Sequence, residues 1–382
     1  MQEIYFDAAA TTCPDKDIID IFVETSCKYY ANPSAMHSLG LEAERAIRTY
    51  AENIAKLLGV SKEELYFTSG GTESNNMAVF GMAKVRSRTH THVITQLSEH
   101  PSVIQPFKRL ESEGFEVTWL VPDESGIISP EQIRQSLRED TGLVAIMHVN
   151  NETGSINDIE AIATLVKNES SAYFFSDGVQ GFGKFRVNLK NIDAYSFSGH
   201  KIGCVKGIGG LYLSNKVRII PQILGGGQQK NMRSGTENPA GVAALAKASE
   251  LAFSNMAQHH AQALSVKNKL LELADLLSDV HVNANGENSS PYILNMSFLG
   301  IRSEVLLHTL AEEGIFVSAG SACSAGKKDK ERNVLYTMGY DKEIFESAVR
   351  LSFSPENTVE EAAKCINIIT EKVNFLRKYT RR

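Results

Sequence analysis

The feature that most constrains the fold of this chain is an alternation of short apolar runs with amphipathic stretches between about residues 60 and 215. The run 143–147 is apolar at every position, as expected of a parallel strand that helices cover on both faces. This alternation predicts an α/β domain with a mainly parallel, seven-stranded sheet. The predicted strands are 65–68, 92–95, 115–121, 143–149, 172–176, 194–198 and 210–213, and the predicted helices are 73–86, 101–113, 130–138 and 158–168.

The last third of the chain has a different pattern, typical of a small α+β unit. Two long helices are expected first, and the second leads into the smaller unit. We therefore expect a large domain over residues 12–256 and a small domain formed by residues 1–11 and 257–382. The expected elements of this part are helices at 238–255, 257–277 and 359–378 and strands at 292–298, 315–317 and 349–353.

Composition argues against several classes of function. The chain has 39 Lys and Arg against 45 Asp and Glu, a net charge of −6, and so lacks the cationic surface that binds nucleic acid or anionic membrane. No apolar run approaches the ~18–20 residues of a membrane span, and the N-terminus has no secretion-signal pattern. Five cysteines without Cys-x-x-Cys spacing, and ten scattered histidines, predict free thiols, no metal site and a cytoplasmic enzyme.

Unusual polar residues follow several predicted strands, at the edge of the sheet where open parallel sheets bind ligands. Residues 68–76 follow one strand and open a helix. Their two glycines let the backbone approach a ligand, and the free N–H groups together with Thr72 would hold an anion such as phosphate. A well-capped helix start is an equally good explanation. The segment is neither a P-loop nor the three-glycine dinucleotide fingerprint.

Two charged residues stand at the ends of buried strands. Lys201 follows the run 194–198, and burying an ammonium group costs several kcal/mol unless it is paired. A lysine that forms a Schiff base would explain this position, and a solvated loop lysine is the alternative. Asp177 follows an apolar run, with Gln180 one turn later, and needs a cationic partner such as a protonated pyridine nitrogen.

Further polar residues follow two other strands. Glu99 and His100 come after the strand at 92–95, and Asn150 and Glu152 come after the strand at 143–149. A single His or Asn at a strand end usually forms ordinary loop hydrogen bonds. Five strand ends with complementary chemistry indicate a ligand site instead.

Cys323 lies in a segment of small and polar residues that three lysines follow closely. Such surroundings favour an exposed loop, at about residues 318–332, rather than a buried structural thiol. Nearby lysines favour the thiolate, which is the reactive form of cysteine. An incidental surface thiol is the alternative.

Taken together, these segments resemble the cysteine desulfurases of the class V aminotransferase family, which have the type I fold of pyridoxal phosphate-dependent transferases. The Gly-Ser-Ala-Cys sequence at 320–323 resembles the members with a long catalytic loop, which supply sulfur to iron–sulfur clusters and thiolated tRNA. The resemblance runs nearly end to end through nine motifs, at 5–12, 32–34 with His37, 69–75, 99–100, 148–152, 196–201, 225–228, 233–236 and 320–323.

The resemblance implies pyridoxal 5′-phosphate as cofactor and assigns residues to its ring. Lys201 would carry the cofactor as a Schiff base. His100 would stack on the ring and assist proton transfer, and Asp177 would hold the pyridine nitrogen. Asn150 and Gln180 would contact the ring hydroxyl.

The resemblance also implies a phosphate site, a substrate site and a homodimer with a shared active site. Arg350, with Asn32, would bind the carboxylate of the substrate through a guanidinium fork that Lys cannot match. The residues implied for the phosphate are Gly71, Thr72, Ser198, Gly199 and His200, joined by Thr236 of the neighbouring subunit.

The implied reaction takes sulfur from L-cysteine, releases L-alanine and leaves a persulfide on Cys323 for an acceptor protein in iron–sulfur cluster or thio-cofactor and tRNA biosynthesis. Cys323 is also a candidate transient ligand of a nascent cluster. A selenocysteine lyase or a small-substrate class V aminotransferase is the alternative on the same fold. A catalytically silent sulfur-relay scaffold is the alternative outside enzymes, and the joint presence of Lys201, Asp177, His100 and Cys323 argues against it.

The chain departs from the family pattern at three places. Gly178 follows Asp177 where Ala is common, and residues 202–205 replace the usual Tyr-Gly-Pro before Lys206. We expect Cys204, within that stretch, to be a small filler residue. The chain also ends soon after its last predicted helix, so we expect no long C-terminal tail for an acceptor.

Overall fold

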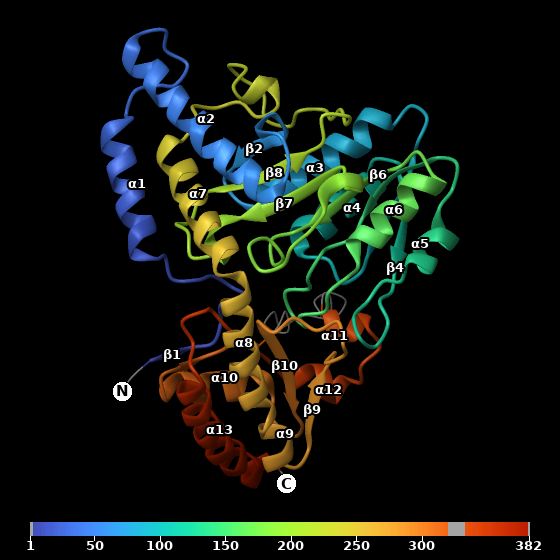
Figure 1. The fold of residues 1–382 in the computed structure, drawn as a ribbon. Helices are drawn as coiled ribbons and strands as arrows, with labels where there is room; N and C mark the ends of the chain where they lie inside the picture. The colour runs from blue at the N-terminus through green and yellow to red at the C-terminus, as the bar shows by residue number, and fades with distance from the viewer. Residues whose placement is uncertain (1–2, 320–332, 381–382) are drawn as a thin grey trace.

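The computed structural model describes residues 3–319 and 333–380, which form a large lobe and a small lobe joined through helix α8 (Figure 1). The strands of the large lobe are β2 (Leu65–Thr68), β3 (His92–Gln96), β4 (Glu116–Leu120), β5 (Thr141–Ala145), β6 (Tyr173–Asp177), β7 (Ala194–Ser198) and β8 (Gly209–Leu213). Its helices are α1 (Lys16–Lys28), α2 (Ser38–Leu58), α3 (Gly71–Arg86), α4 (Pro101–Ser112), α5 (Pro130–Ser136), α6 (Ile159–Glu169) and α7 (Pro239–Ser254).

The seven strands form one sheet in the order β2-β8-β7-β6-β5-β3-β4. Strand β8 runs antiparallel to both of its neighbours, and the other neighbouring pairs are parallel. The predicted sheet, seven-stranded and mainly parallel, is therefore confirmed. Because β3, β5, β6 and β7 are parallel, their carboxyl ends meet at one edge of the sheet.

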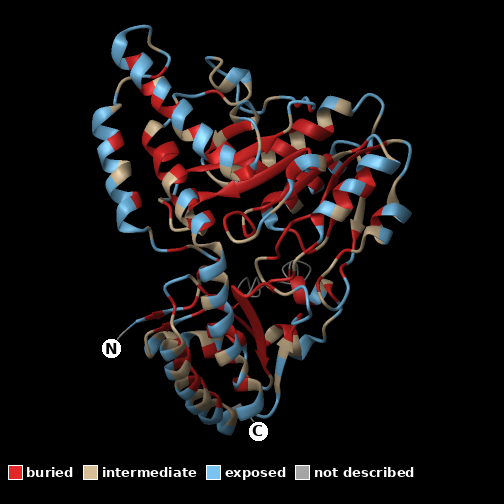
Figure 2. Cartoon of the chain, in the orientation of Figure 1, coloured by how far each residue is buried: buried red, intermediate tan, exposed pale blue. Residues whose placement is uncertain are grey.

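Helices cover both faces of this sheet, which is why its strands are apolar at successive positions. Neighbouring residues of one strand belong to different apolar clusters, as Leu143 and Val144 do. One cluster packs the sheet against α3 and α4, and the other packs it against α2, α6 and α7. Figure 2 shows the central strands buried and the outer helix surfaces exposed.

The small lobe has its own apolar core, which includes Ile4 and Phe6 from the start of the chain. A three-stranded antiparallel sheet has the order β12-β10-β9, and β1 pairs in parallel with β11. The boundaries between the large and the small domain, expected at residues 12 and 257, stay a proposal. The elements are β1 (Ile4–Tyr5), α8 (Met256–Leu271), α9 (Leu273–Leu276), β9 (Val280–Asn283), β10 (Ile293–Phe298), α10 (Ser303–Glu312), β11 (Ile315–Phe316), α11 (Val334–Thr337), α12 (Lys342–Glu346), β12 (Ala348–Ser352) and α13 (Val359–Thr380).

Some element bounds differ from the sequence predictions. Strand β5 ends at Ala145, although the predicted strand continued to 149, because Ile146 and His148 bond to β6 without a regular ladder. Asp177 is the last residue of β6 rather than the residue after it. Within the described residues, no helix combines the length and the apolar character that crossing a membrane requires.

Candidate active site

The carboxyl ends of the parallel strands surround a cavity of about 430 Å³. It lies where β6 and β7 meet the N-termini of α3 and α4 and where residues 9–10 cross from the small lobe. The predicted site residues that line it are Gly71, Thr72, His100, Asp177, Gln180, Ser198, His200, Lys201 and Arg350. Four further polar residues line the cavity, and none of them has a role implied by the family resemblance: Asn75, Ser102, Asn151 and Glu152.

One end of the cavity is built to hold an anion. Helix α3 begins at Gly71, and its N-cap Gly70 provides no side-chain hydrogen bond to the first turn. Backbone N–H groups at such a helix start attract phosphate. The hydroxyl of Ser198 is buried in the same wall and has no hydrogen-bond partner. This unpaired donor beside an uncapped helix start fits the phosphate group of pyridoxal 5′-phosphate.

Lys201 ends a short 3-10 helix, Gly199–Lys201, that follows β7 directly. Its Nζ donates hydrogen bonds to the carbonyl oxygens of Ala9, at 2.5 Å, and Ala10, at 2.7 Å. Burial and the nearby Arg350 guanidinium lower the pKa of Lys201 to about 8, although three carboxylates oppose the shift. A lysine with this pKa is neutral in roughly a tenth of molecules at pH 7, a far larger share than for an ordinary lysine, and the neutral amine is the nucleophilic form.

Asp177 is buried and accepts two hydrogen bonds, from Asn75 Nδ2 at 2.6 Å and from the backbone N–H of Val179 at 2.9 Å. Burial and the charge of Asp177 raise the pKa of the neighbouring Glu99 to about 8. Glu99 is therefore mostly protonated at neutral pH and adds little negative charge. A carboxylate held in this way fits a cationic ring nitrogen.

His100 caps α4 and faces the same cavity. Its Nδ1 accepts the backbone N–H of Ser102 at 3.1 Å and lies 2.7 Å from the Ser102 hydroxyl. Burial, reinforced by the charge of Lys201, lowers the pKa of His100 even though Asp177 opposes the shift. The neutral ring therefore keeps its proton on Nε2, which leaves that nitrogen as a donor toward the cavity.

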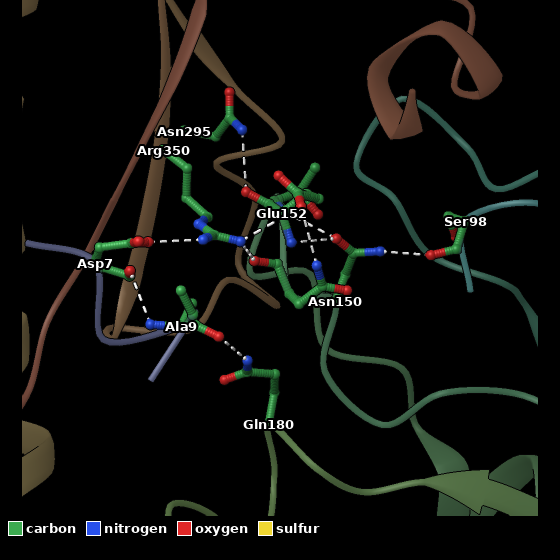
Figure 3. Close-up of polar contacts among 12 residues, drawn as sticks. Asp7, Ala9, Ser98, Asn150, Glu152, Gln180, Asn295 and Arg350 are labelled. Atoms are coloured by element: carbon green, nitrogen blue, oxygen red, sulfur yellow. Dashed lines mark hydrogen bonds and ion pairs between the residues drawn. The ribbon is translucent and has the colours of Figure 1, made fainter. Parts of the chain in front are cut away.

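The structure corrects the assignment of Asn150. Its Nδ2 donates to the carbonyl of Ser98 at 2.9 Å, and its Oδ1 accepts the backbone N–H groups of Glu152 and Thr153, so both ends of the amide are engaged (Figure 3). Asn151, the next residue, lines the cavity instead. We therefore move the proposed ring contact from Asn150 to Asn151. The two asparagines are adjacent, and nothing in the sequence indicates which of them faces the cavity.

Arg350 lies on β12 and reaches the cavity from the small lobe between two carboxylates (Figure 3). Its Nη2 is 2.7 Å from Asp7 Oδ1, and its Nη1 is 3.3 Å from Glu152 Oε1 and 2.9 Å from the carbonyl of Asn151. Its Nε is buried without a hydrogen-bond partner, as is Glu152 Oε2. An incoming carboxylate therefore finds an oriented guanidinium, and it has to compete with two carboxylates of the chain itself.

The remaining predicted residues lie elsewhere. Gly199 packs against Cys204, where an added Cβ would lie 2.9 Å from the Cys204 Cβ. Cys204 is buried, and burial raises its pKa to about 12, which suits the expected filler role. Asn32 and Thr236 are exposed, and neither lines this cavity within one chain. Cys323 lies outside the described residues.

Tyr195 explains the glycine that follows Asp177. The buried Tyr195 ring lies against Gly178, and its hydroxyl is 2.9 Å from Nδ1 of His148. Burial lowers the pKa of His148 to about 4, so its neutral ring is suited to this hydrogen bond. An added Cβ at Gly178 would lie 1.9 Å from Cζ of Tyr195, and one at Gly181 would lie 2.2 Å from Nδ1 of His148. The turn that carries Asp177 therefore needs glycine at both places.

Replacing Gly178 by Ala is expected to lower the free energy of unfolding by about 1–3 kcal/mol, the usual cost of overpacking a close-packed interior. The cause is the overlap with the Tyr195 ring, so Tyr195→Leu in the same chain should restore part of the loss. Gly286→Ala is the matched control, because its Cβ would lie 3.6 Å from the nearest atom. Urea unfolding measures all three, and a Gly178→Ala variant as stable as the unaltered chain would contradict the packing.

Comparisons with known proteins agree with this architecture. The class V aminotransferase family matches residues 4–364. The putative cysteine desulfurase IscS 1 of Bacillus subtilis is 36% identical over 98% of this chain and 100% of its own length. The cysteine desulfurase IscS of Methanosarcina thermophila is 36% identical over 98% of this chain and 93% of its own length.

Solved structures agree as well, and they confirm the predicted fold class. A NifS-like protein superposes with a TM-score of 0.92 and 34% identity over 98% of this chain and 100% of its own. The protein SspA, solved in complex with cysteine, superposes with a TM-score of 0.79 and 31% identity over 93% of this chain and 99% of its own.

Proposed function

This chain belongs to the class V aminotransferase family and, within it, to the cysteine desulfurases, and from that membership we propose how it works. The proposed reaction removes sulfur from L-cysteine, releases L-alanine and leaves the sulfur as a persulfide on Cys323. The observation that carries the proposal is one cavity in which the Lys201 amine, the Asp177 carboxylate and an uncapped helix start converge.

The residues present fit pyridoxal 5′-phosphate as cofactor. Gly71, Thr72, Ser198 and His200 would hold its phosphate, Asp177 its ring nitrogen, and Gln180 and Asn151 its ring hydroxyl. When bound, this cofactor supplies an electron sink for a carbanion at the substrate Cα.

The residues of the chain supply the binding and the proton transfers. Arg350 binds the substrate carboxylate and so fixes the orientation of the substrate, including its Cα hydrogen, within the cavity. The neutral amine of Lys201 then removes that proton. His100, whose Nε2 carries a proton, assists the proton transfers at the substrate.

The sulfur transfer requires the thiolate of Cys323. It attacks the substrate sulfur, so that an S–S bond forms while the Cβ–S bond breaks and its electron pair stays with the carbon. A proton then completes the methyl group of alanine. We further propose that a separate acceptor protein collects this sulfur for iron–sulfur cluster or thio-cofactor and tRNA biosynthesis.

We further propose a cytoplasmic homodimer with a shared active site. Thr236 is exposed in its own chain and lies outside the cavity that contains Lys201, which supports a role toward the neighbouring subunit. Asn32 is also exposed, between α1 and α2, and its proposed substrate contact stays a prediction.

The proposal is tested by adding L-cysteine to the purified chain with pyridoxal 5′-phosphate and a thiol reductant. We expect alanine and sulfide in equal amounts, and no dependence on a keto acid. Selenocysteine lyase activity without cysteine turnover, or turnover that needs a keto acid, would contradict the proposal and favour the two alternatives on this fold.

The lowered pKa of Lys201 predicts the pH dependence of cofactor capture. Only the neutral amine attacks an aldehyde, so covalent capture by the cofactor-free chain should speed up through a pKa of about 8 and level off above it. An ordinary lysine would level off only above its reference pKa of about 10.4. Rapid-mixing absorbance over a pH series measures this rate. A rate that still rises steeply from pH 9 to 10 would contradict the assignment.

A further inference from the structure

Lys184 is a second lysine near the cavity, and the reaction as described gives it no role. It lies on the turn after β6, and its ammonium donates a hydrogen bond to Gln180 Oε1 at 3.0 Å. It also lies 5.5 Å from the centre of the Tyr292 ring. Lys184 also lines a second cavity of about 810 Å³, as Lys201 does.

The surroundings of Lys184 are electrostatically unusual. The two charged groups that act on it are Lys201 and Arg350, both cationic, and together with burial they lower its pKa to about 7. Within residues 3–319 and 333–380, no carboxylate forms an ion pair with it. A partly buried cation without a counter-charge costs stability, so its position suggests another role.

The hydrogen bond from Lys184 fixes which way the Gln180 amide points. Because Lys184 Nζ donates to Gln180 Oε1, Gln180 presents its oxygen to Lys184 and its NH₂ group to the opposite side. That NH₂ group donates to the carbonyl of Ala9 at 2.8 Å (Figure 3). The same carbonyl accepts the Lys201 ammonium, so the donors of Gln180 and Lys201 converge on one oxygen atom.

This convergence identifies the cofactor atom that Gln180 meets. Lys201 bonds to the aldehyde carbon of pyridoxal 5′-phosphate, and the ring hydroxyl oxygen is the acceptor next to that carbon. We propose that Lys184 is a positioning residue, which holds the Gln180 amide so that its NH₂ group donates to this ring oxygen. The inference rests on the proposed function, since it needs the cofactor on Lys201.

Replacing Lys184 by Met tests the inference. The variant removes the ammonium and lets the Gln180 amide turn over, so cofactor affinity should fall about tenfold, the usual effect of losing one charge-assisted hydrogen bond. The pH at which the bound cofactor changes its absorbance should rise. A nearby cation and a donor to the ring oxygen both favour the form without the extra proton. The variant removes the cation and no longer holds the Gln180 donor in place.

Two controls separate this effect from a general loss of structure. Lys184→Arg keeps a cation and a donor, so it should keep the absorbance titration of the unaltered chain. Lys267→Met is the matched control, because burial also lowers the pKa of Lys267, to about 8. Its ammonium bonds to Ser290 in the small lobe, away from the cavity, so this variant should keep cofactor affinity and titration.

A double-mutant cycle tests whether Lys184 acts through Gln180. In a Gln180→Ala chain, Lys184→Met should change cofactor affinity less than about twofold. Gln180→Glu gives a second test if Lys184→Met folds poorly, because it keeps the partner of Lys184 and removes the NH₂ donor. It should raise the pH of the absorbance change as Lys184→Met does.

The outcomes separate the inference from the proposed function. If the unaltered chain takes up pyridoxal 5′-phosphate and Lys184→Met has the same affinity and titration, the positioning role is wrong. The positioning role is also wrong if Lys184→Met lowers cofactor affinity as much in the Gln180→Ala chain as in the unaltered one. If the unaltered chain binds no cofactor at all, the proposed function itself fails, and the inference falls with it.

Discussion

Replacing Cys323 by Ala is expected to lower the rate of alanine formation from cysteine by a factor on the order of 10³ or more, because the nucleophile that takes the sulfur is gone. The same variant should bind pyridoxal 5′-phosphate as the unaltered chain does. The residues of this chain that line the cavity and are proposed to hold the cofactor are unaltered in this variant. Alanine release and cofactor absorbance, measured on one preparation, separate the two properties.

Cys27 provides the matched control for this variant. It is an exposed free thiol on α1, outside the residues that line the cavity. Cys27→Ala should therefore keep both the rate and the absorbance. A Cys323→Ala chain with full alanine and sulfide release would contradict the persulfide route, and the thiol reductant would then be the group that takes the sulfur.

Replacing Lys201 by Ala is expected to have an effect at least as large, on the order of 10³-fold or more in rate, because the chain loses both its covalent link to the cofactor and its base. The phosphate site at the start of α3 and the carboxylate of Asp177 remain, so the variant should still bind the cofactor without a covalent bond. Gel filtration should then remove the cofactor from the variant and leave it on the unaltered chain.

Lys190 is a suitable control for the removal of a lysine, since it is exposed in a short 3-10 helix on the surface of the large lobe. Lys190→Ala should keep both the covalent cofactor and the activity. Borohydride treatment before digestion shows which lysine carries the cofactor. Retention of covalent cofactor in Lys201→Ala would place the Schiff base on another lysine, and the account of the cavity would be wrong.

The sequence predicted the central sheet well because its strands are short, apolar and covered on both faces. Leu143 and Val144 show this signal, since each packs into a different apolar cluster. The same logic predicted the cavity, because the carboxyl ends of parallel strands meet at one edge and bring Asp177 near Lys201. These parts of the site depend on local pattern and simple topology.

Contacts between segments far apart in the chain could not be predicted from the sequence pattern. Asp7 and Ala9 come from the crossing at the start of the chain, yet Asp7 pairs with Arg350 and Ala9 accepts Lys201. No periodicity links residues more than 190 positions apart. The choice between Asn150 and Asn151 failed for a different reason. It depends on which of the two side-chain amides already has both of its ends hydrogen-bonded within the protein, and that amide belongs to Asn150.

Helices α1 and α2 were not predicted, although both have clear apolar faces. Residues such as Ile54 and Leu58 bury one side of α2 against α7, while the other side stays exposed. The pair Gly178 and Tyr195 could not be predicted either. A glycine after Asp177 appeared only as a departure from the family pattern, and the ring that requires it lies 17 positions further along the chain.

The most direct test is to supply the pyridoxal phosphate-loaded chain with a single equivalent of L-cysteine, without reductant, and to map its cysteines by mass spectrometry. The account predicts one added sulfur atom on the peptide that contains residue 323 and one alanine released for each sulfur retained. Alanine released while that peptide keeps its original mass, or sulfur found on another cysteine instead, would contradict it.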